Sequence, residues 1–169
     1  MKISKCLIAT ALAGMIVSAP VYAAQLTMVA NIAFDTPLSM TKSSDIDFGT
    51  MKASQPGTYV INTSGAVTPS GGGVFLHGTP VEGRIVVAGS STQTVTISTG
   101  SYVPNSNVTP SGATCKYGTS AAAPCDSGLS VPPPGTATTL LVGVQVVADG
   151  TQSPGSTAAP TFTITTVYN

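Results

Sequence analysis

Short alternating segments separated by turn-forming residues constrain the fold of this chain more than any other feature. The chain holds 18 glycines and 13 prolines, which recur every few residues after residue 24. No stretch between them places apolar residues at helical spacing, whereas many alternate apolar and polar residues as half-buried strands do. We therefore predict one all-β domain over residues 24–169, an antiparallel sandwich of about eight or nine strands, with a closed barrel as the alternative.

The same patterns predict where the strands lie. In chain order they are expected at residues 25–34, 45–51, 58–62, 73–77, 84–89, 93–99, 138–148 and 161–169. Residues 100–134 are predicted to be rich in loops, and they end in three consecutive prolines that no strand can cross. Gly49, inside the second of these segments, is expected to mark a bulge or a close approach.

The first 23 residues have the three parts of a bacterial secretory signal peptide. Lys2 and Lys5 precede an apolar run over residues 6–17, and Val21 and Ala23 occupy the −3 and −1 positions of a cleavage site. The run is shorter than the roughly 20 residues that a membrane-spanning helix needs. We expect a cleaved signal, no membrane span after cleavage, and a protein of the periplasm, the cell surface or the extracellular space.

Charge is scarce in the remainder of the chain. After residue 23 there are four basic and six acidic residues, a formal charge of −2. Without a basic patch to neutralise phosphates, a nucleic-acid partner is not expected.

Two cysteines, Cys115 and Cys125, remain after the expected signal is removed. An even pair in an exported chain favours a structural disulfide. A redox or metal pair would need a Cys-x-x-Cys spacing or histidine partners, and neither is present.

The sequence offers no combination of residues suited to catalysis, cofactor binding or metal binding. His77 is the only histidine and is expected to be an ordinary strand residue. Asp45 and Asp47 share a strand face but lack the further ligands of a calcium loop, and residues 70–73 lack the lysine of a phosphate-binding loop. We therefore predict that the protein is not an enzyme.

Two terminal segments are suited to assembly. Extended segments with alternating apolar residues can add to the open edge of a neighbouring sheet. The simpler alternative is that each is an ordinary first or last strand of its own sandwich. The residues expected to act in assembly are Leu26, Met28, Ile32 and Phe34 in the first segment, and Phe162, Ile164 and Tyr168 in the last.

Several strand-and-turn motifs resemble those of the bacterial family of exported proteins called domain of unknown function 4402. They are IDFGT at 46–50, GTYVI at 57–61, VFLHGTP at 74–80, RIVVAG at 84–89 and FTITTVYN at 162–169. The resemblance implies an immunoglobulin-like sandwich at the cell envelope and brings no established activity. The penultimate tyrosine, Tyr168, on an alternating final strand is also similar to pilin subunits of chaperone–usher systems.

Together these patterns favour an exported structural or adhesive protein of the bacterial surface, pilin-subunit-like and without catalysis. Its expected partners are itself or other surface subunits, joined by strand addition, and a periplasmic chaperone. The alternative is a periplasmic or secreted binding module that recognises a ligand through the loops at 100–134. Tyr102 and Tyr117 would supply aromatic contacts there.

Overall fold

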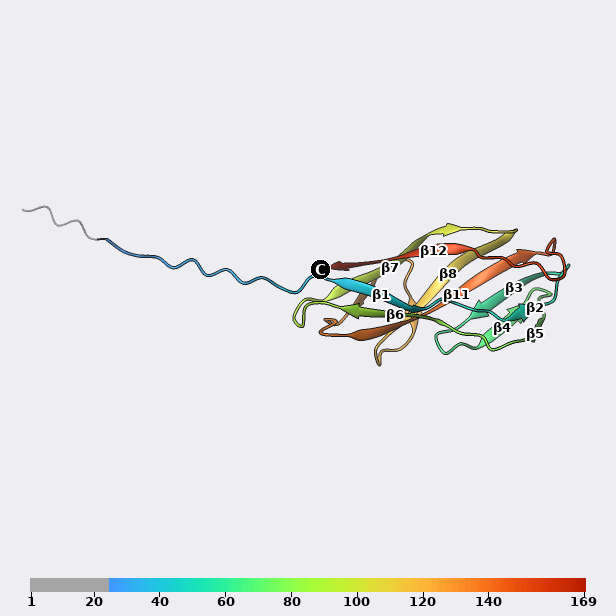
Figure 1. The fold of residues 1–169 in the computed structure, drawn as a ribbon, viewed down its shortest axis with the longest axis horizontal. Helices are drawn as coiled ribbons and strands as arrows, with labels where there is room; N and C mark the ends of the chain where they lie inside the picture. The colour runs from blue at the N-terminus through green and yellow to red at the C-terminus, as the bar shows by residue number, and fades with distance from the viewer. Residues whose placement is uncertain (1–24) are drawn as a thin grey trace, which may run out of the picture. The chain divides into compact units, whose positions relative to one another are not determined.

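A computed structural model describes residues 25–169, so the predicted signal peptide lies outside the described residues. Residues 34–169 form one compact unit built from strands (Figure 1). The strands are β1 Ser39–Ser44, β2 Thr50–Met51, β3 Pro56–Ile61, β4 Val67–Ser70, β5 Phe75–His77, β6 Gly83–Ala88, β7 Val95–Val103, β8 Val108–Tyr117, β9 Ala123–Pro124, β10 Leu129–Val131, β11 Thr138–Asp149 and β12 Thr161–Tyr168. In the described part of the chain, no helix has the length and apolar character to cross a membrane.

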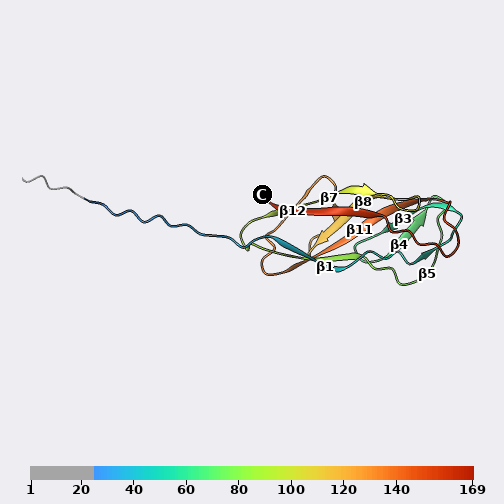
Figure 2. The same ribbon diagram turned by 45° about the horizontal axis from the view of Figure 1, so that its top comes forward.

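Two of the three antiparallel sheets form a sandwich, and the third is the short pair of β2 and β5. In the larger sheet β11 is central: β8 pairs along one edge, while β6 and β3 share the other edge and are followed outward by β1 and β4. The smaller sheet has the order β10-β7-β12. The turned view separates β7 and β12 from β1 and β4 (Figure 2). The sandwich prediction is confirmed, whereas the immunoglobulin-like connectivity stays a prediction. The described chain has twelve strands instead of the predicted eight or nine, because strands as short as β2, β9 and β10 have no alternating pattern of their own.

The core lies where the alternating face of β11 meets the smaller sheet. Leu140, Val142, Val144 and Val146 are at most 7% exposed, as their period of two predicts. Two residues of β7, Val95 and Ile97, also belong to the core, and both are fully buried. Alternation therefore located the central strands correctly.

Residues 25–34 do not form the predicted strand. The described chain has no regular secondary structure before β1, which lies at residues 39–44 and pairs with β6. Alternation gives a segment the capacity to be a strand, but a strand also needs a backbone partner. β1 was not predicted, because its largely polar sequence, SMTKSS, has no alternation of apolar and polar residues. Polar residues are common in an exposed edge strand.

Residues 100–134 are less rich in loops than predicted. They contain the end of β7, all of the ten-residue β8, and the short β9 and β10. Small and polar residues conceal the pattern of β8, although Ala113, Cys115 and Tyr117 alternate inward and are buried. The triple proline follows β10 directly, which confirms that no strand crosses it.

The predicted disulfide between Cys115 and Cys125 is present. Their Cα atoms lie 5.8 Å apart and both residues are fully buried. The Cys125 backbone N–H donates to the Ala113 carbonyl, and the Cys125 carbonyl accepts from the Thr99 N–H on β7, each at 3.2 Å. The disulfide therefore fixes a segment that touches both sheets.

Candidate assembly site

The segment from Gln25 to Phe34 carries the first group of predicted assembly residues and presents them to solvent. Leu26, Met28, Ile32 and Phe34 are 76–88% exposed, and the segment contains no charged side chain. A group of large apolar side chains exposed close together usually marks an interaction site. The alternative that this segment is the first strand of its own sandwich does not match the structure, because no described strand includes it.

The chain enters the domain at a cluster of hydrogen bonds around Ser90. The Ser90 hydroxyl donates to the Asp35 carboxylate at 2.5 Å, and the buried Ser90 N–H donates to the Tyr168 hydroxyl oxygen at 2.6 Å. The Tyr168 hydroxyl donates in turn to the Thr36 carbonyl at 2.8 Å. We call these four residues the entry anchor. They hold the beginning of the domain against the last residue of β12.

Electrostatics and close packing support the entry anchor. Hydrogen bonds from the Ser90 hydroxyl and the Thr36 N–H hold the pKa of the Asp35 carboxyl below its ordinary value. Gly89 is required beside it, because a Cβ there would lie 2.3 Å from the Tyr168 hydroxyl. Sequence reasoning singled out Tyr168 for its position but missed Asp35 and Ser90, whose pairing over 55 residues has no local signal.

β12 carries the second group of predicted residues and forms an edge of the smaller sheet. It pairs with β7 on one side, and among the described strands none pairs with its other side. Phe162, Ile164 and Tyr168 lie on its inner face, half-buried against the core. The ring of Phe162 stacks on that of Tyr102 with centroids 5.6 Å apart. An inward apolar face is thus combined with a free backbone edge.

A groove of about 940 Å³ opens beside this edge. Val142, Val144 and Val146 of β11 form its floor, so the groove reaches the core of the sandwich. Phe162 and Ile164 form one wall. The opposite wall is the segment from residue 45 to residue 53, whose half-buried apolar members are Ile46, Phe48 and Met51. We call this feature the β12 groove.

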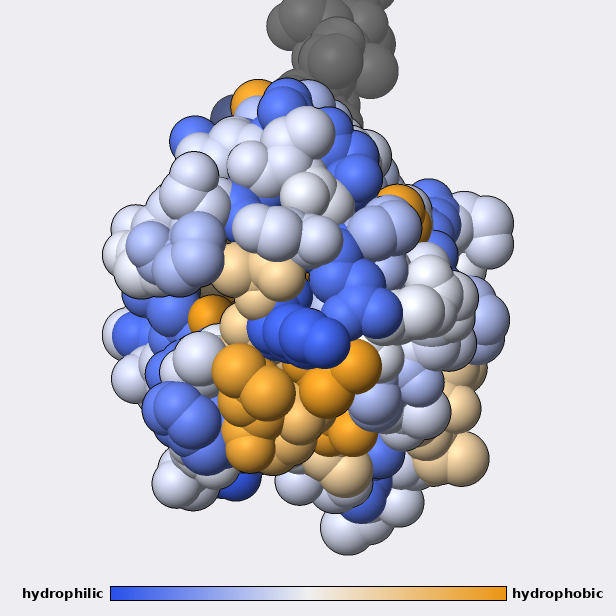
Figure 3. Space-filling view, turned by 90° about the vertical axis from the view of Figure 1, so that its right-hand side faces the viewer, coloured by the Kyte–Doolittle hydropathy of each residue, from blue (hydrophilic) through white to orange (hydrophobic). Residues whose placement is uncertain are grey.

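The wall opposite β12 is held by close backbone packing. Gly49 has a φ of +75°, and a Cβ there would lie 3.0 Å from both the Phe75 ring and the His77 carbonyl, which confirms the predicted close approach. Asp47 and Val81 exchange backbone hydrogen bonds of 2.8 and 2.9 Å. Apolar surface also gathers on the end of the domain formed by β2 and β5 (Figure 3), where Leu76 is 51% exposed.

A second polar cluster lies inside the smaller sheet. The hydroxyls of Thr99 and Tyr102 both donate to the Asp126 carboxylate. Partial burial raises the pKa of Asp126, but these two hydrogen bonds outweigh it and leave that pKa below its ordinary value. Burial, with the neighbouring carboxylate, raises the pKa of Tyr102. The cluster fixes the residue after the disulfide and contains no nucleophile with an activating base.

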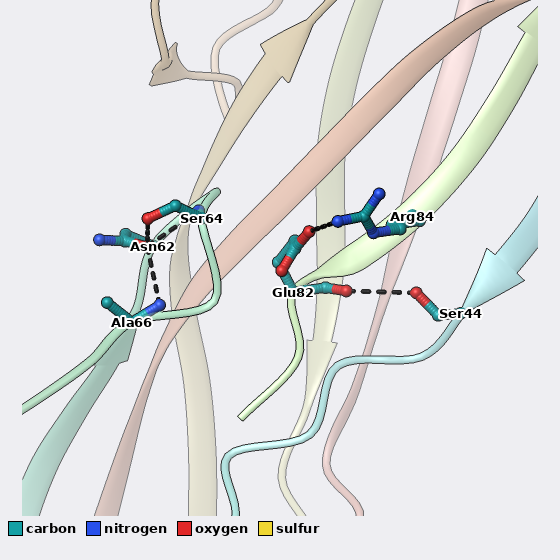
Figure 4. A network of polar contacts seen from close by, with 6 residues as sticks. All are labelled: Ser44, Asn62, Ser64, Ala66, Glu82 and Arg84. Atoms are coloured by element: carbon teal, nitrogen blue, oxygen red, sulfur yellow. Dashed lines mark hydrogen bonds and ion pairs between the residues drawn. The ribbon is translucent and has the colours of Figure 1, made fainter. Parts of the chain in front are cut away.

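Glu82 is the one strongly buried acid among the described residues, and it has a structural partner. Its side chain is paired with the Arg84 guanidinium at 2.5 Å, and its carbonyl accepts from the Ser44 hydroxyl at 3.3 Å (Figure 4). Nearby, the Asn62 side-chain oxygen accepts hydrogen bonds from Ser64 and Ala66 and closes the β3–β4 turn. These contacts stabilise loops at the ends of β3 and β6.

The remaining sequence candidates are dispersed. His77 is exposed at the end of β5, Asp45 pairs with Lys42 at 2.7 Å, and Asp47 accepts from the Gly49 N–H. Within residues 25–169, no three histidine, cysteine or acidic side chains gather as metal ligands. Residues 70–73 form the turn after β4.

The predicted recognition surface at residues 100–134 is formed only in part by loops. Tyr117 is 3% exposed on β8, and Tyr102 is half-buried on β7, so neither ring is displayed for ligand stacking. A shallow pocket of about 290 Å³ lies between Tyr117 and Pro133. The binding-module alternative stays a prediction, with this shallow pocket as the concave surface of the region.

Comparison with known proteins identifies a family over the range of residues that contains the β12 groove. No curated protein and no solved structure matches the chain. The family model described as domain of unknown function DUF4402 matches residues 38–168, from just before β1 to the last residue of β12. This range spans both sheets and confirms the resemblance drawn from the motifs. The chain is a member of the DUF4402 family.

Proposed function

We propose that this protein is an exported, non-enzymatic structural or adhesive subunit of the bacterial cell surface that assembles by strand addition. The observation that carries the proposal is the segment from Gln25 to Phe34, which is uncharged, alternates apolar residues and belongs to no described strand. The buried disulfide is compatible with export, as is the signal-like sequence of residues 1–23.

The exposed apolar side chains of this segment make its contact with water unfavourable in free energy. Each large apolar side chain that moves from water into a protein interior contributes about 1.5–3 kcal/mol. When an extended segment adds to an open sheet edge, its backbone N–H and C=O groups form hydrogen bonds with the groups of that edge. Leu26, Met28, Ile32 and Phe34 therefore favour any acceptor that offers an apolar surface beside a free strand edge.

The test is to express the full chain for export in a bacterial host and to purify the processed protein. Mass spectrometry should find Ala24 as the first residue. Light scattering after size exclusion, with electron microscopy, should find assemblies of several copies, whereas a variant lacking residues 24–33 should be monomeric. That variant retains Phe34 and Asp35, so it leaves the compact unit intact.

Matched substitutions separate strand addition from general stickiness. Met28→Asn and Ile32→Asn alter the alternating face and should abolish assembly. Val29→Asn removes an equally exposed apolar side chain from the opposite face and should leave assembly intact, because successive strand residues point to opposite sides. A strictly monomeric full chain, unaffected by loss of residues 24–33, would exclude the proposed function.

A further inference from the structure

The β12 groove points to where such a segment binds. We infer that residues 25–34 of a second copy of this chain insert into the β12 groove as a strand beside β12, antiparallel to it. This inference rests on the proposed function and adds to it the acceptor, the strand direction and the order of subunits. It would complete the smaller sheet as a four-stranded one, β10-β7-β12 plus the donated strand.

The donated segment matches the groove in length and chemistry. Ten extended residues span about 33 Å and the eight residues of β12 about 26 Å, so the segment is long enough to span the groove, which opens along the first half of β12. The segment has no charged residue, and the valine floor of the groove has none either. Four charged residues line the groove, and all four are exposed at its rim: Lys42, Asp45, Asp47 and Lys52. Lys42 and Asp45, 64% and 79% exposed, pair with each other. Insertion would bury no unpaired charge.

The alternating pattern fits a surface with one apolar side. In a strand, Leu26, Met28, Ala30, Ile32 and Phe34 point to the same face. Facing the groove, they would contact the valines of β11 and the apolar wall of residues 45–53. The opposite face, which includes Thr27 and Asn31, would meet solvent. The small Ala30 lies at the centre of the inward row.

Strand direction distinguishes a second copy from the chain's own segment. The entry anchor holds Asp35 and Thr36 at the Tyr168 end of β12. A chain's own segment could therefore return along β12 only with its Phe34 end at Tyr168, which is the parallel direction. Every strand pair in the described sheets is antiparallel. Antiparallel addition to β12 requires Phe34 at the Thr161 end, and only another copy can supply that arrangement.

The resulting assembly is an open, head-to-tail chain. Each subunit donates from the end of the domain that carries the entry anchor. It accepts in a groove that opens along the first half of β12, beside the turn from β11. Donor and acceptor surfaces are different, so the interface is heterologous and extends into a filament unless the rotation between subunits closes a ring.

The first test converts the donated strand into part of the same chain. A variant lacking residues 24–33 receives a short Gly/Ser linker after Asn169, followed by a copy of residues 25–34. A hairpin connection places the copy antiparallel to β12. The fused protein should be monomeric and should melt about 5 °C or more above the truncated protein. Met28→Asn and Ile32→Asn within the copy should remove the gain, whereas Val29→Asn within the copy should keep it.

The second test alters the groove in the full chain. Ile164→Arg places a charge on the groove wall, and Ala159→Trp fills the groove from its exposed rim without changing the core. Each should weaken assembly by about tenfold or more, since one large apolar contact is worth at least that in affinity. Val167→Arg, on the outward face of β12 where Val167 is 52% exposed, is the control and should assemble normally.

The outcomes separate this inference from the proposed function. If the full chain assembles through residues 24–33 but the fused copy gives no stabilisation and both groove variants assemble normally, the acceptor lies elsewhere and only this inference fails. If the full chain is a monomer that melts as high as the fused protein, its own segment fills the groove in parallel, which overturns donation between copies. A full chain that is monomeric and melts like the truncated protein overturns the proposed function as well.

Discussion

The Tyr168 hydroxyl joins chain segments that are 132 residues apart. It accepts from the buried Ser90 N–H and donates to the Thr36 carbonyl. Of the two bonds, the first matters more for stability, because a backbone N–H buried without a partner costs about 1–3 kcal/mol. This side chain thus contributes two of the three hydrogen bonds of the entry anchor.

Tyr168→Phe should therefore lower the free energy of unfolding by about 1–3 kcal/mol, since the Ser90 N–H loses its acceptor while the ring is retained. Urea denaturation of the variant lacking residues 24–33 would measure this without interference from assembly. Val167→Ala, at the neighbouring exposed position, should change the free energy by about 0.5 kcal/mol or less. Equal effects of the two substitutions would contradict the role assigned to the hydroxyl.

Asp35 makes the entry anchor sensitive to acid. Its folded-state pKa lies below the ordinary value of 3.8, so its contribution is fully present above that value and is lost as the pH falls through the lowered pKa. In an NMR titration, the Asp35 carboxyl carbon should titrate below 3.8, and the Ser90 amide should report the same transition. Asp35→Asn should abolish that transition at Ser90. Titration of Asp35 at or above 3.8 would contradict the anchor.

At the scale of elements, the disulfide and β12 have opposite roles. The disulfide closes the β8–β9 hairpin, and the segment after β9 also bonds to β7, so this region is fixed within the domain. Among the described strands, β12 has a partner on one side only, and its other edge is the acceptor in the proposed assembly. The fixed hairpin lies beside β11 in the larger sheet, and the open edge of β12 lies beside β7 in the smaller sheet.

Reduction of the disulfide should lower the free energy of unfolding by about 2–3 kcal/mol, because a closed loop of this length restricts the unfolded chain. Urea denaturation with and without reductant measures the effect. The double variant Cys115→Ala/Cys125→Ala serves as the control and should not respond to reductant. A wild-type protein equally stable in both conditions would contradict a stabilising role for the bond.

Elements also differ in how far the sequence could predict them. Alternation located β7, β11 and β12, because each has one face in the core and a β-branched inner row. It missed β1 and β8, whose residues are polar or small and whose pairing is determined by distant neighbours. The cysteine pair followed from chemistry alone. The β12 groove could not be predicted, because it is produced by the missing neighbour of an edge strand, which is a property of topology.

At the scale of the whole molecule, the scarcity of charge determines which forces are available for assembly. The whole chain has six basic and six acidic residues, and the segment from Gln25 to Phe34 has none. The ion pairs in the described part, Lys42–Asp45 and Glu82–Arg84, join groups within one domain. In the proposed assembly, contacts between subunits would therefore depend mainly on apolar burial and backbone hydrogen bonds.

Assembly should accordingly be insensitive to salt. Between about 0.05 M and 0.5 M sodium chloride, where screening of exposed charges changes strongly, the assembled fraction should change by less than about threefold. Sedimentation velocity at a fixed protein concentration would measure it. Addition of charge to the segment by Thr27→Lys, on its outward face, provides a comparison that should introduce salt dependence. Dissociation of the unaltered protein at high salt would show that ionic contacts hold it together.

The entry anchor has a mechanical consequence. A pull on the N-terminal segment along the direction of β1 reaches the domain at the anchor and then at the ladder from Ser39–Ala88 to Ser44–Arg84. Because the force runs parallel to the strands, it loads these hydrogen bonds together in shear instead of opening them one after another. A subunit linked in this way would resist tension through a whole strand.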